Sequence, residues 1–386
     1  MSAPAAAASP NVPAIIGAIA TIATMGIGLS LSIPLLSLRM EAAGYSARAI
    51  GLQTAMGALS TLFGAPFVPA LIRRFGERPF LVMAIGAGIV CLIGFGLISD
   101  INYWYPLRLV YGAAITAIFV VGEYAINALA PEGRRGFVMG LYSTALALGF
   151  AAGPLLLSIT GTQGMTPFLA GAAIFAVAAA PAILIGAGAA PLGEAASGGA
   201  LAFLFKSPSA TFAALAFGAV ETGVLGLLPV YALRIGLEEA GGEALLSLCL
   251  VGSALLAFPM GYISDHVDRR QFLLGIGCVG LIGALAMPLV AGNFALLGAL
   301  IFIWGGIVGA LYPVGLAHLG SRHSGADLAS ANAAFVMLYS LGMLFAPPLL
   351  GAGLDLWNPH GFTAGLALLF ALYCALVAAR LAAKTA

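Results

Sequence analysis

The sequence predicts an all-α integral membrane protein with twelve transmembrane helices in two similar six-helix halves. Of its 386 residues, 62% are hydrophobic and only 8% are charged, whereas a soluble chain is about one-quarter charged. A short pattern also occurs twice, about half a chain apart, as PLLSLR at 34–39 and PVYALR at 229–234. A hydrophobic chain made of two similar halves is typical of transporters that alternate access around a central site.

The individual spans follow from the length of the apolar runs. A spanning helix needs about 20 mostly apolar residues, and continuous runs of this kind differ from the alternating pattern of a membrane β-barrel. Turn-prone residues at 161–164 and 292–293 divide two long uncharged runs. The predicted spans are 13–37, 49–72, 79–99, 102–130, 137–160, 165–190, 208–232, 244–264, 271–291, 294–318, 327–350 and 361–379.

Basic residues predict the orientation of these spans, because they gather in cytoplasmic loops. With the N-terminus inside, the inner loops and the tail carry most of them: Arg73, Arg74, Arg78, Arg134, Arg135, Lys206, Arg269, Arg270, Arg322, Arg380 and Lys384. The outer loops carry Arg39, Arg48 and Arg234. We therefore expect a bacterial-type inner membrane protein with both termini in the cytoplasm. Six-helix bundles at 1–190 and 208–386 would be joined by a Gly/Ala/Ser-rich cytoplasmic linker at 191–207.

Several other classes of protein are disfavoured by the sequence. A net charge of +1 gives no electrostatic reason to bind nucleic acid. The four cysteines lie in apolar runs without metal-ligand spacing, and no phosphate-binding loop or other enzyme motif occurs. The N-terminus lacks the basic region of a cleaved signal peptide. We expect a monomer that has no enzymatic activity, metal or cofactor, and whose partners are a small-molecule substrate, protons and the lipid bilayer.

Three local motifs resemble those of the major facilitator superfamily. Residues 261–270 (GYISDHVDRR) resemble its loop signature, in which a glycine is followed four residues later by an aspartate and then by a basic turn. Residues 108–112 (RLVYG) resemble its Arg-x-x-x-Gly motif. Gly149, Gly153 and Pro154 resemble its antiporter-type helix-packing motif. The resemblance covers nearly the whole chain, and it implies the twelve-helix fold of this superfamily and a transport function.

The first-half loop departs from this signature, since Pro69 and Arg73 stand where glycine and aspartate are expected. The residues at 258–270, at Gly122-Glu123 and at 221–234 resemble those of the YcaD-type branch of the superfamily. That resemblance does not identify a substrate.

The loop resemblance also implies a gate at the cytoplasmic face. By pseudo-symmetry, Asp265 should face the start of span five near Gly136, beside Arg134 and Arg135, and stabilise the closed cytoplasmic side through its charge at a helix N-terminus. Alternatively, these charges only anchor loops and set the topology. The gate candidates are Asp265, Asp268, Arg269, Arg270, Arg134, Arg135 and Arg78.

Three ionisable side chains lie inside predicted spans, where a charge costs about 2.5–3.5 kcal/mol on insertion scales. Glu221 lies near the midplane of span seven, where it either couples transport to protons or substrate, or is a protonated, structural glutamate. Glu123 lies nearer the cytoplasmic end of span four and either pairs with Arg78 or Arg135 or takes part in transport. Arg108 either balances an anionic substrate or a proton-carrying carboxylate, or extends to the membrane interface.

Amide and aromatic residues in the spans are candidates to line a central cavity, although tyrosines near span ends often belong to interfacial belts. The candidates are Gln53, Asn127, Tyr142, Tyr231, Tyr312, Asn332 and Tyr339. The leading hypothesis is a proton-coupled secondary transporter that exports a small, amphipathic organic molecule by antiport. The alternatives are a proton-coupled importer and a membrane sensor or scaffold that uses the same fold without transporting anything.

Overall fold

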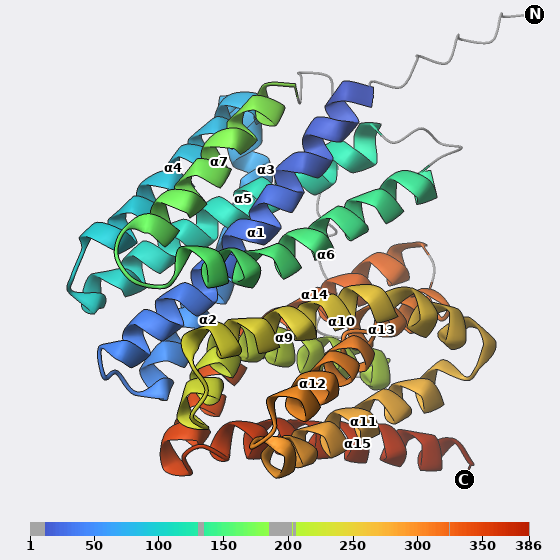
Figure 1. Ribbon diagram of the computed structural model, residues 1–386. Helices are drawn as coiled ribbons and strands as arrows, with labels where there is room; N and C mark the ends of the chain where they lie inside the picture. Colours follow the sequence, from blue (N-terminus) through green and yellow to red (C-terminus); the bar gives the residue numbers. More distant parts are fainter. Residues whose placement is uncertain (1–11, 130–134, 185–202, 204–205, 324, 386) are drawn as a thin grey trace, which may run out of the picture.

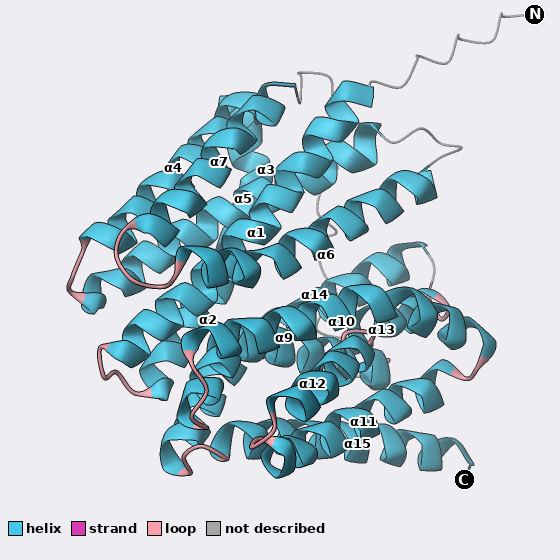
Figure 2. Cartoon of the chain, viewed as in Figure 1, coloured by secondary structure: helices cyan, strands magenta, loops and turns pink. Residues whose placement is uncertain are grey.

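The computed structural model describes residues 12–129, 135–184, 203, 206–323 and 325–385, and this part of the chain is built of helices and loops without strands (Figures 1 and 2). The first group of elements is α1 (Val12–Ala42), α2 (Ala47–Gly64), η1 (Ala65–Phe67), α3 (Val68–Phe75), α4 (Glu77–Leu97), η2 (Ile101–Tyr103), α5 (Trp104–Leu129), α6 (Arg135–Thr160) and α7 (Thr166–Leu184). The second group is α9 (Pro208–Arg234), α10 (Glu239–His266), α11 (Arg269–Val290), α12 (Phe294–Val308), α13 (Leu311–Gly320), α14 (Gly325–Leu356) and α15 (Gly361–Thr385).

Ten helical segments of the described chain are long and apolar enough to cross a membrane. Polar side chains start several of these helices by accepting hydrogen bonds from exposed backbone amides. Ser46 caps α2 through the amide of Ala49, and Asn293 caps α12 through the amide of Leu296, at 3.2 and 3.1 Å. Gly76 has a positive φ of 81°, which turns the chain between α3 and α4. These local signals account for the helix boundaries at the loops.

The helices extend beyond several of the predicted spans. Pro34 lies inside α1, which continues to Ala42, and Pro229 lies inside α9, which continues to Arg234. Proline is tolerated inside such helices because neighbouring helices and local adjustments satisfy the freed backbone groups. The predicted start of span eight at residue 244 is also wrong, since α10 begins at Glu239.

The two groups of helices lie on opposite sides of Figure 1, with most of α1 to α7 toward the upper left and α9 to α15 toward the lower right, while α2 lies beside α9. Contacts between the groups are made by α2 with α14, α6 with α10, and α1 and α2 with α9. Glycines allow the closest approaches: Gly51 of α2 packs on the backbone of Pro347, and Gly351 of α14 packs on that of Ala47. The site described below lies where these helices meet.

Candidate functional site

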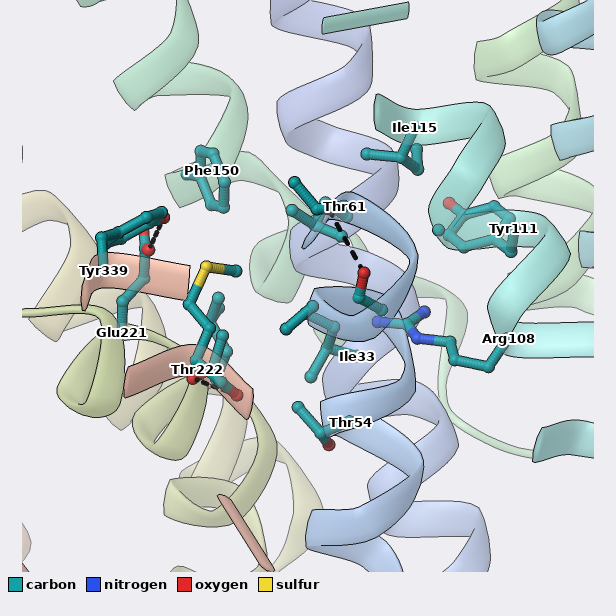
Figure 3. Close-up of a pocket in the computed structure, with 16 residues that line it drawn as sticks. Ile33, Thr54, Thr61, Arg108, Tyr111, Ile115, Phe150, Glu221, Thr222 and Tyr339 are labelled. Atoms are coloured by element: carbon teal, nitrogen blue, oxygen red, sulfur yellow. Dashed lines mark hydrogen bonds between the residues drawn. The ribbon is translucent and has the colours of Figure 1, made fainter. Parts of the chain in front are cut away.

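A pocket lies between the two groups of helices and contains about 540 Å³ of space free of atoms, part of it open to solvent (Figure 3). Helices α1, α2, α5 and α6 line it from one side, and α9 and α14 line it from the other. Its lining residues are Leu29, Ile33, Thr54, Gly57, Ala58, Thr61, Arg108, Tyr111, Gly112, Ile115, Phe150, Glu221, Thr222, Leu225, Tyr339 and Met343. Most of this surface is apolar, so the few polar groups determine its chemistry.

Arg108 supplies the positive charge of the pocket from α5. Its side chain is buried, at 1% exposure, and its Nη1 donates a hydrogen bond to Ser32 Oγ at 3.1 Å. The guanidinium lies over the Tyr111 ring, 5.4 Å from the ring centroid. No carboxylate in the described part of the chain pairs with it, and its Nε has no hydrogen-bond partner there. This arginine therefore does not extend to the membrane interface, and part of its hydrogen-bonding capacity is unused.

The position of Arg108 depends on close packing between α2 and α5. Gly112 of α5 leaves no room for a side chain against Ser60 and Gly57 of α2. Ser60 Oγ donates to the carbonyl oxygen of Leu109 at 2.8 Å, which ties the two helices together. The missing side chain at Gly57 also leaves space beside the guanidinium. Small residues thus hold a large cation at the pocket wall.

Glu221 supplies a carboxyl group from α9, on the opposite wall of the pocket (Figure 3). Tyr339 of α14 donates its hydroxyl hydrogen to Glu221 Oε2 at 2.5 Å. The two helices approach closely because Gly218 lies against the backbone of Tyr339. The Tyr339 ring is held by stacking on Phe217, with ring centroids 6.1 Å apart. Glu221 forms no ion pair with any basic residue that the structure describes.

The pocket therefore presents a cation and a carboxyl group on opposite walls of an apolar space, and the two do not pair. Hydroxyl groups of Thr54, Thr61 and Thr222 add hydrogen-bonding capacity. Such an arrangement can bind a solute with an apolar body and polar or charged ends, and its carboxyl group can exchange a proton.

The structure brings three of the predicted residues to this pocket: Arg108, Glu221 and Tyr339. Tyr312 lies behind Tyr339, with ring centroids 5.4 Å apart, and does not line the pocket. The side chains of Glu123, Asn127 and Tyr142 lie outside the described residues.

Three other cavity candidates do not line this pocket. Gln53 is fully buried in α2, is not among the residues that line the pocket, and has no hydrogen-bond partner in the described chain. Tyr231 packs inside the second group against Phe362, with ring centroids 5.6 Å apart. Asn332 is exposed on α14. Tyr231 lies on the face of α9 opposite Thr222, so the rotation of the helix directs it away from the pocket. Asn332 shares a face of α14 with Tyr339 but lies two helical turns before it.

Sequence reasoning also missed several residues that line the pocket from α2 and one buried carboxyl group of α10. Thr54, Gly57, Ala58 and Thr61 follow one face of α2 at helical spacing, and this pattern of small and hydroxyl residues could have revealed the lining face. Glu243 of α10 was excluded by the predicted start of its span. It is 1% exposed, and its carboxyl oxygens find no hydrogen-bond partner among the described residues.

One end of the molecule is held together by an ion pair and by hydrogen bonds between the two groups, and we call it the latched end. Arg234 at the end of α9 pairs with Glu41 at the end of α1 at 2.8 Å, and with Asp355 of α14 at 3.3 Å. Asp355 also accepts hydrogen bonds from the backbone amides of Ala47 and Arg48, both at 2.9 Å. These contacts of Arg234, Glu41 and Asp355 join α1, α2, α9 and α14 at one end of the molecule.

The predicted gate residues lie at the opposite end, and the described contacts there are local. Asp265 pairs with Arg269 of its own loop at 2.6 Å. Asp268 caps α11, and the backbone N–H of Gln271 lowers the pKa of its carboxyl group by donating a hydrogen bond to it. Arg78 is exposed. Arg134 lies outside the described residues, as does the side chain of Arg135, whose backbone begins α6.

Comparison with known proteins identifies the class. The sequence model of the Major Facilitator Superfamily matches residues 18–249 and 236–385, so the chain belongs to this superfamily of membrane transporters, which are not enzymes. It is 27% identical over 331 residues to YfkF of Bacillus subtilis, described as an uncharacterized MFS-type transporter, covering 83% of this chain and 84% of YfkF. It is 25% identical over 301 residues to a transporter of the same description from Enterobacter sp., covering 77% and 78% of the two chains.

Solved structures share the fold at low sequence identity. The nucleoside transporter NupG superposes with a TM-score of 0.74 at 14% identity, over 97% of this chain and 98% of NupG. A bacterial homolog of the human lysosomal transporter Spinster, in an inward-facing and unoccupied conformation, gives 0.77 at 12% identity, over 97% and 96%. A D-xylose–proton symporter gives 0.73 at 16% identity, over 96% and 97%.

Proposed function

We propose that this protein is a secondary active transporter that moves a small, amphipathic organic solute by alternating access and couples this movement to protons. The observation that carries the proposal is the pocket in which Arg108 and Glu221 lie on opposite walls, one from each group of helices, without pairing. A solute between them contacts both groups, so binding can depend on how the groups are arranged.

The proposed topology has twelve spans in two six-helix halves, at 1–190 and 208–386, joined by a cytoplasmic linker at 191–207. In this scheme α2 with α3, and α12 with α13, each form one bent span, while α6 and α7 complete the first half. The distribution of basic residues supports an inner membrane location with both termini in the cytoplasm. The latched end then faces the periplasm.

The latched end suggests how access alternates. With Arg234 holding Glu41 and Asp355, solute enters the pocket from the cytoplasmic side. The reverse conformation would release these pairs and bring Asp265 to the start of α6, where a carboxylate is favoured by the helix dipole. The present pairing of Asp265 with Arg269 is compatible with the open state of that gate.

We infer that Glu221 is the proton-coupling group, because it is the one carboxyl group among the described residues that line the pocket, and its partner Tyr339 is neutral. Arg108 then binds the anionic or electron-rich part of the solute. Export by antiport is the preferred direction, since Gly149, Gly153 and Pro154 resemble the antiporter motif and Gly149 and Gly153 pack tightly on α1. A proton symporter with the same fold favours import as the second possibility.

The test is a solute screen with purified protein in proteoliposomes under an imposed pH gradient. We expect at least one amphipathic solute to move against its own concentration gradient only when the pH gradient is present. A protonophore collapses the pH gradient. If it leaves the transport of every active solute unchanged, proton coupling is contradicted. Absence of any transport, together with retained folding, would favour the sensor or scaffold alternative.

A further inference from the structure

A second pocket lies among the helix ends of the second group, away from the site between Arg108 and Glu221. It contains about 630 Å³ of space free of atoms, part of it open to solvent. The start of α9, the start of α11, the end of α13 with the turn that follows it, and the end of α15 surround it. The charged side chains that line it are Lys206, Arg270, Arg322 and Arg380.

The positive charge of this pocket is only partly balanced by the residues around it, since Asp268 interacts electrostatically with Arg270 alone among the four cations. No carboxylate occurs among its lining residues, and none of the four cations forms an ion pair with a carboxylate that the structure describes. Asp268, two residues before Arg270, directs its oxygen to the backbone amides that begin α11. The neighbouring Asp265 is occupied by Arg269. Four like charges from four segments therefore converge on one cavity with unused capacity to bind an anion.

Other groups of the pocket are also suited to an anion. Helix α9 begins at Pro208, and Ser207, Pro208 and Ser209 line the cavity, so the positive end of the helix dipole lies at its wall. Ser207 makes no side-chain capping bond to this helix. His318 lines the pocket at 6% exposure, and its ring makes no hydrogen bond to the residues described. The hydroxyl of Ser207 is held by His323 Nε2 at 2.9 Å. The cavity thus has a buried polar wall at Ser207, Ser209 and His318, while its cations are exposed or, for Arg270, half-buried.

We propose that this pocket binds a phosphate-bearing anion. Arginines that converge from several directions match the oxygen atoms of a phosphate group. The pocket lies at helix ends that the proposed topology places at the cytoplasmic surface, where anionic lipid headgroups are found and basic pockets between helices bind them. A free phosphorylated compound carries the same group, so the experiment distinguishes the two sources.

The test measures the thermal unfolding of delipidated protein in detergent as phosphatidylglycerol, phosphatidylcholine or inorganic phosphate is titrated. For a lipid site, phosphatidylglycerol alone should raise the unfolding temperature. For a free-phosphate site, inorganic phosphate should do so. Arg322→Gln should weaken the apparent affinity by about fivefold, and Arg270→Gln with Arg322→Gln should weaken it further.

The matched control is Arg73→Gln with Arg74→Gln, which removes two exposed arginines from the end of α3. This control should leave the anion effect unchanged. If Arg322→Gln does not fold, the exposed Arg380→Gln and Lys206→Gln serve instead, each with a similar expected loss. Equal responses to anionic and zwitterionic lipid together with no response to phosphate would overturn the proposal. An anion response that the control reduces as much as the pocket variants do would also overturn it.

Discussion

At the scale of single residues, Arg108 is a buried cation that no described carboxylate balances. Burial of an unpaired charge reduces stability, so Arg108→Gln should leave the unfolding temperature unchanged or raise it. The same change should lower kcat/KM for transport by about 30-fold or more, because it removes a desolvated charge that contacts the solute. Arg48→Gln, at an exposed position, is the matched control and should change neither quantity. A large loss of stability with little loss of transport would show that Arg108 is structural.

The same scale shows what the sequence could predict of the site. Arg108 and Glu221 stood out because charged residues are rare in apolar spans. Gln53 and Tyr231 could not be excluded in the same way, because the direction of a side chain depends on which helix faces are covered in the folded protein. Thr54 and Thr61 were missed because hydroxyl residues also occur in ordinary helix packing, where they bond to their own backbone, as both do here.

At the scale of helices, the contact of α6 with α1 depends on glycine. A Cβ at Gly153 would lie 2.7 Å from the backbone nitrogen of Leu31. Gly153→Ala should therefore separate the two helices and lower the free energy of unfolding by about 1–3 kcal/mol. Gly86→Ala on α4 has open space around it and should be neutral or stabilising. Thermal unfolding of both variants checks this, and equal stability of the two would contradict the packing argument.

The latched end gives a prediction about access. Arg234→Gln removes the ion pair with Glu41, which joins the two groups, and the ion pair with Asp355, which lies within the second group. Charge-assisted hydrogen bonds of this kind are worth about 1.5–3 kcal/mol each. The labelling of a cysteine at Thr54 by a membrane-impermeant thiol reagent from the periplasmic side should become about tenfold faster. Cys278 and Cys374 are replaced beforehand. Unchanged labelling in Arg234→Gln would mean that these pairs do not hold the end closed.

The proposed cytoplasmic gate gives a corresponding prediction about access from the other side. Asp265→Asn should destabilise the state that is closed toward the cytoplasm, because it removes the charge proposed to meet the start of α6. The expected effect is about 1–2 kcal/mol, which increases labelling from the cytoplasmic side up to tenfold. If Asp265→Asn has no effect while Arg134→Ala changes the labelling, the proposed partner of the helix terminus is wrong.

The helices themselves were largely predictable from the sequence, since apolar runs of spanning length have few alternatives. Their ends were less so. The ends of α1 and α9 extend to Ala42 and Arg234, and α10 begins at Glu239. Polar contacts stabilise these ends, because Arg234 pairs with Glu41 and Thr162 donates a hydrogen bond to Glu239. These tertiary contacts are invisible in a single sequence.

At the scale of the whole molecule, membership of the superfamily was also within reach, because the motifs at 108–112, 149–154 and 261–270 occur at the expected places along the chain. The pairing of α2 with α14 and of α6 with α10 creates the pocket, and this depends on how the groups dock. The account joins that arrangement to proton coupling through Glu221, which lies where the two groups meet.

The most direct test compares Glu221→Gln with wild type in proteoliposomes, using any solute found by the screen. Glutamine retains the shape of the side chain but cannot titrate. The account predicts that the variant loses accumulation driven by a pH gradient while it still exchanges labelled for unlabelled solute across the membrane. Glu238→Gln, an exposed carboxyl before α10, should retain both activities. Full gradient-driven accumulation by Glu221→Gln would contradict the central claim.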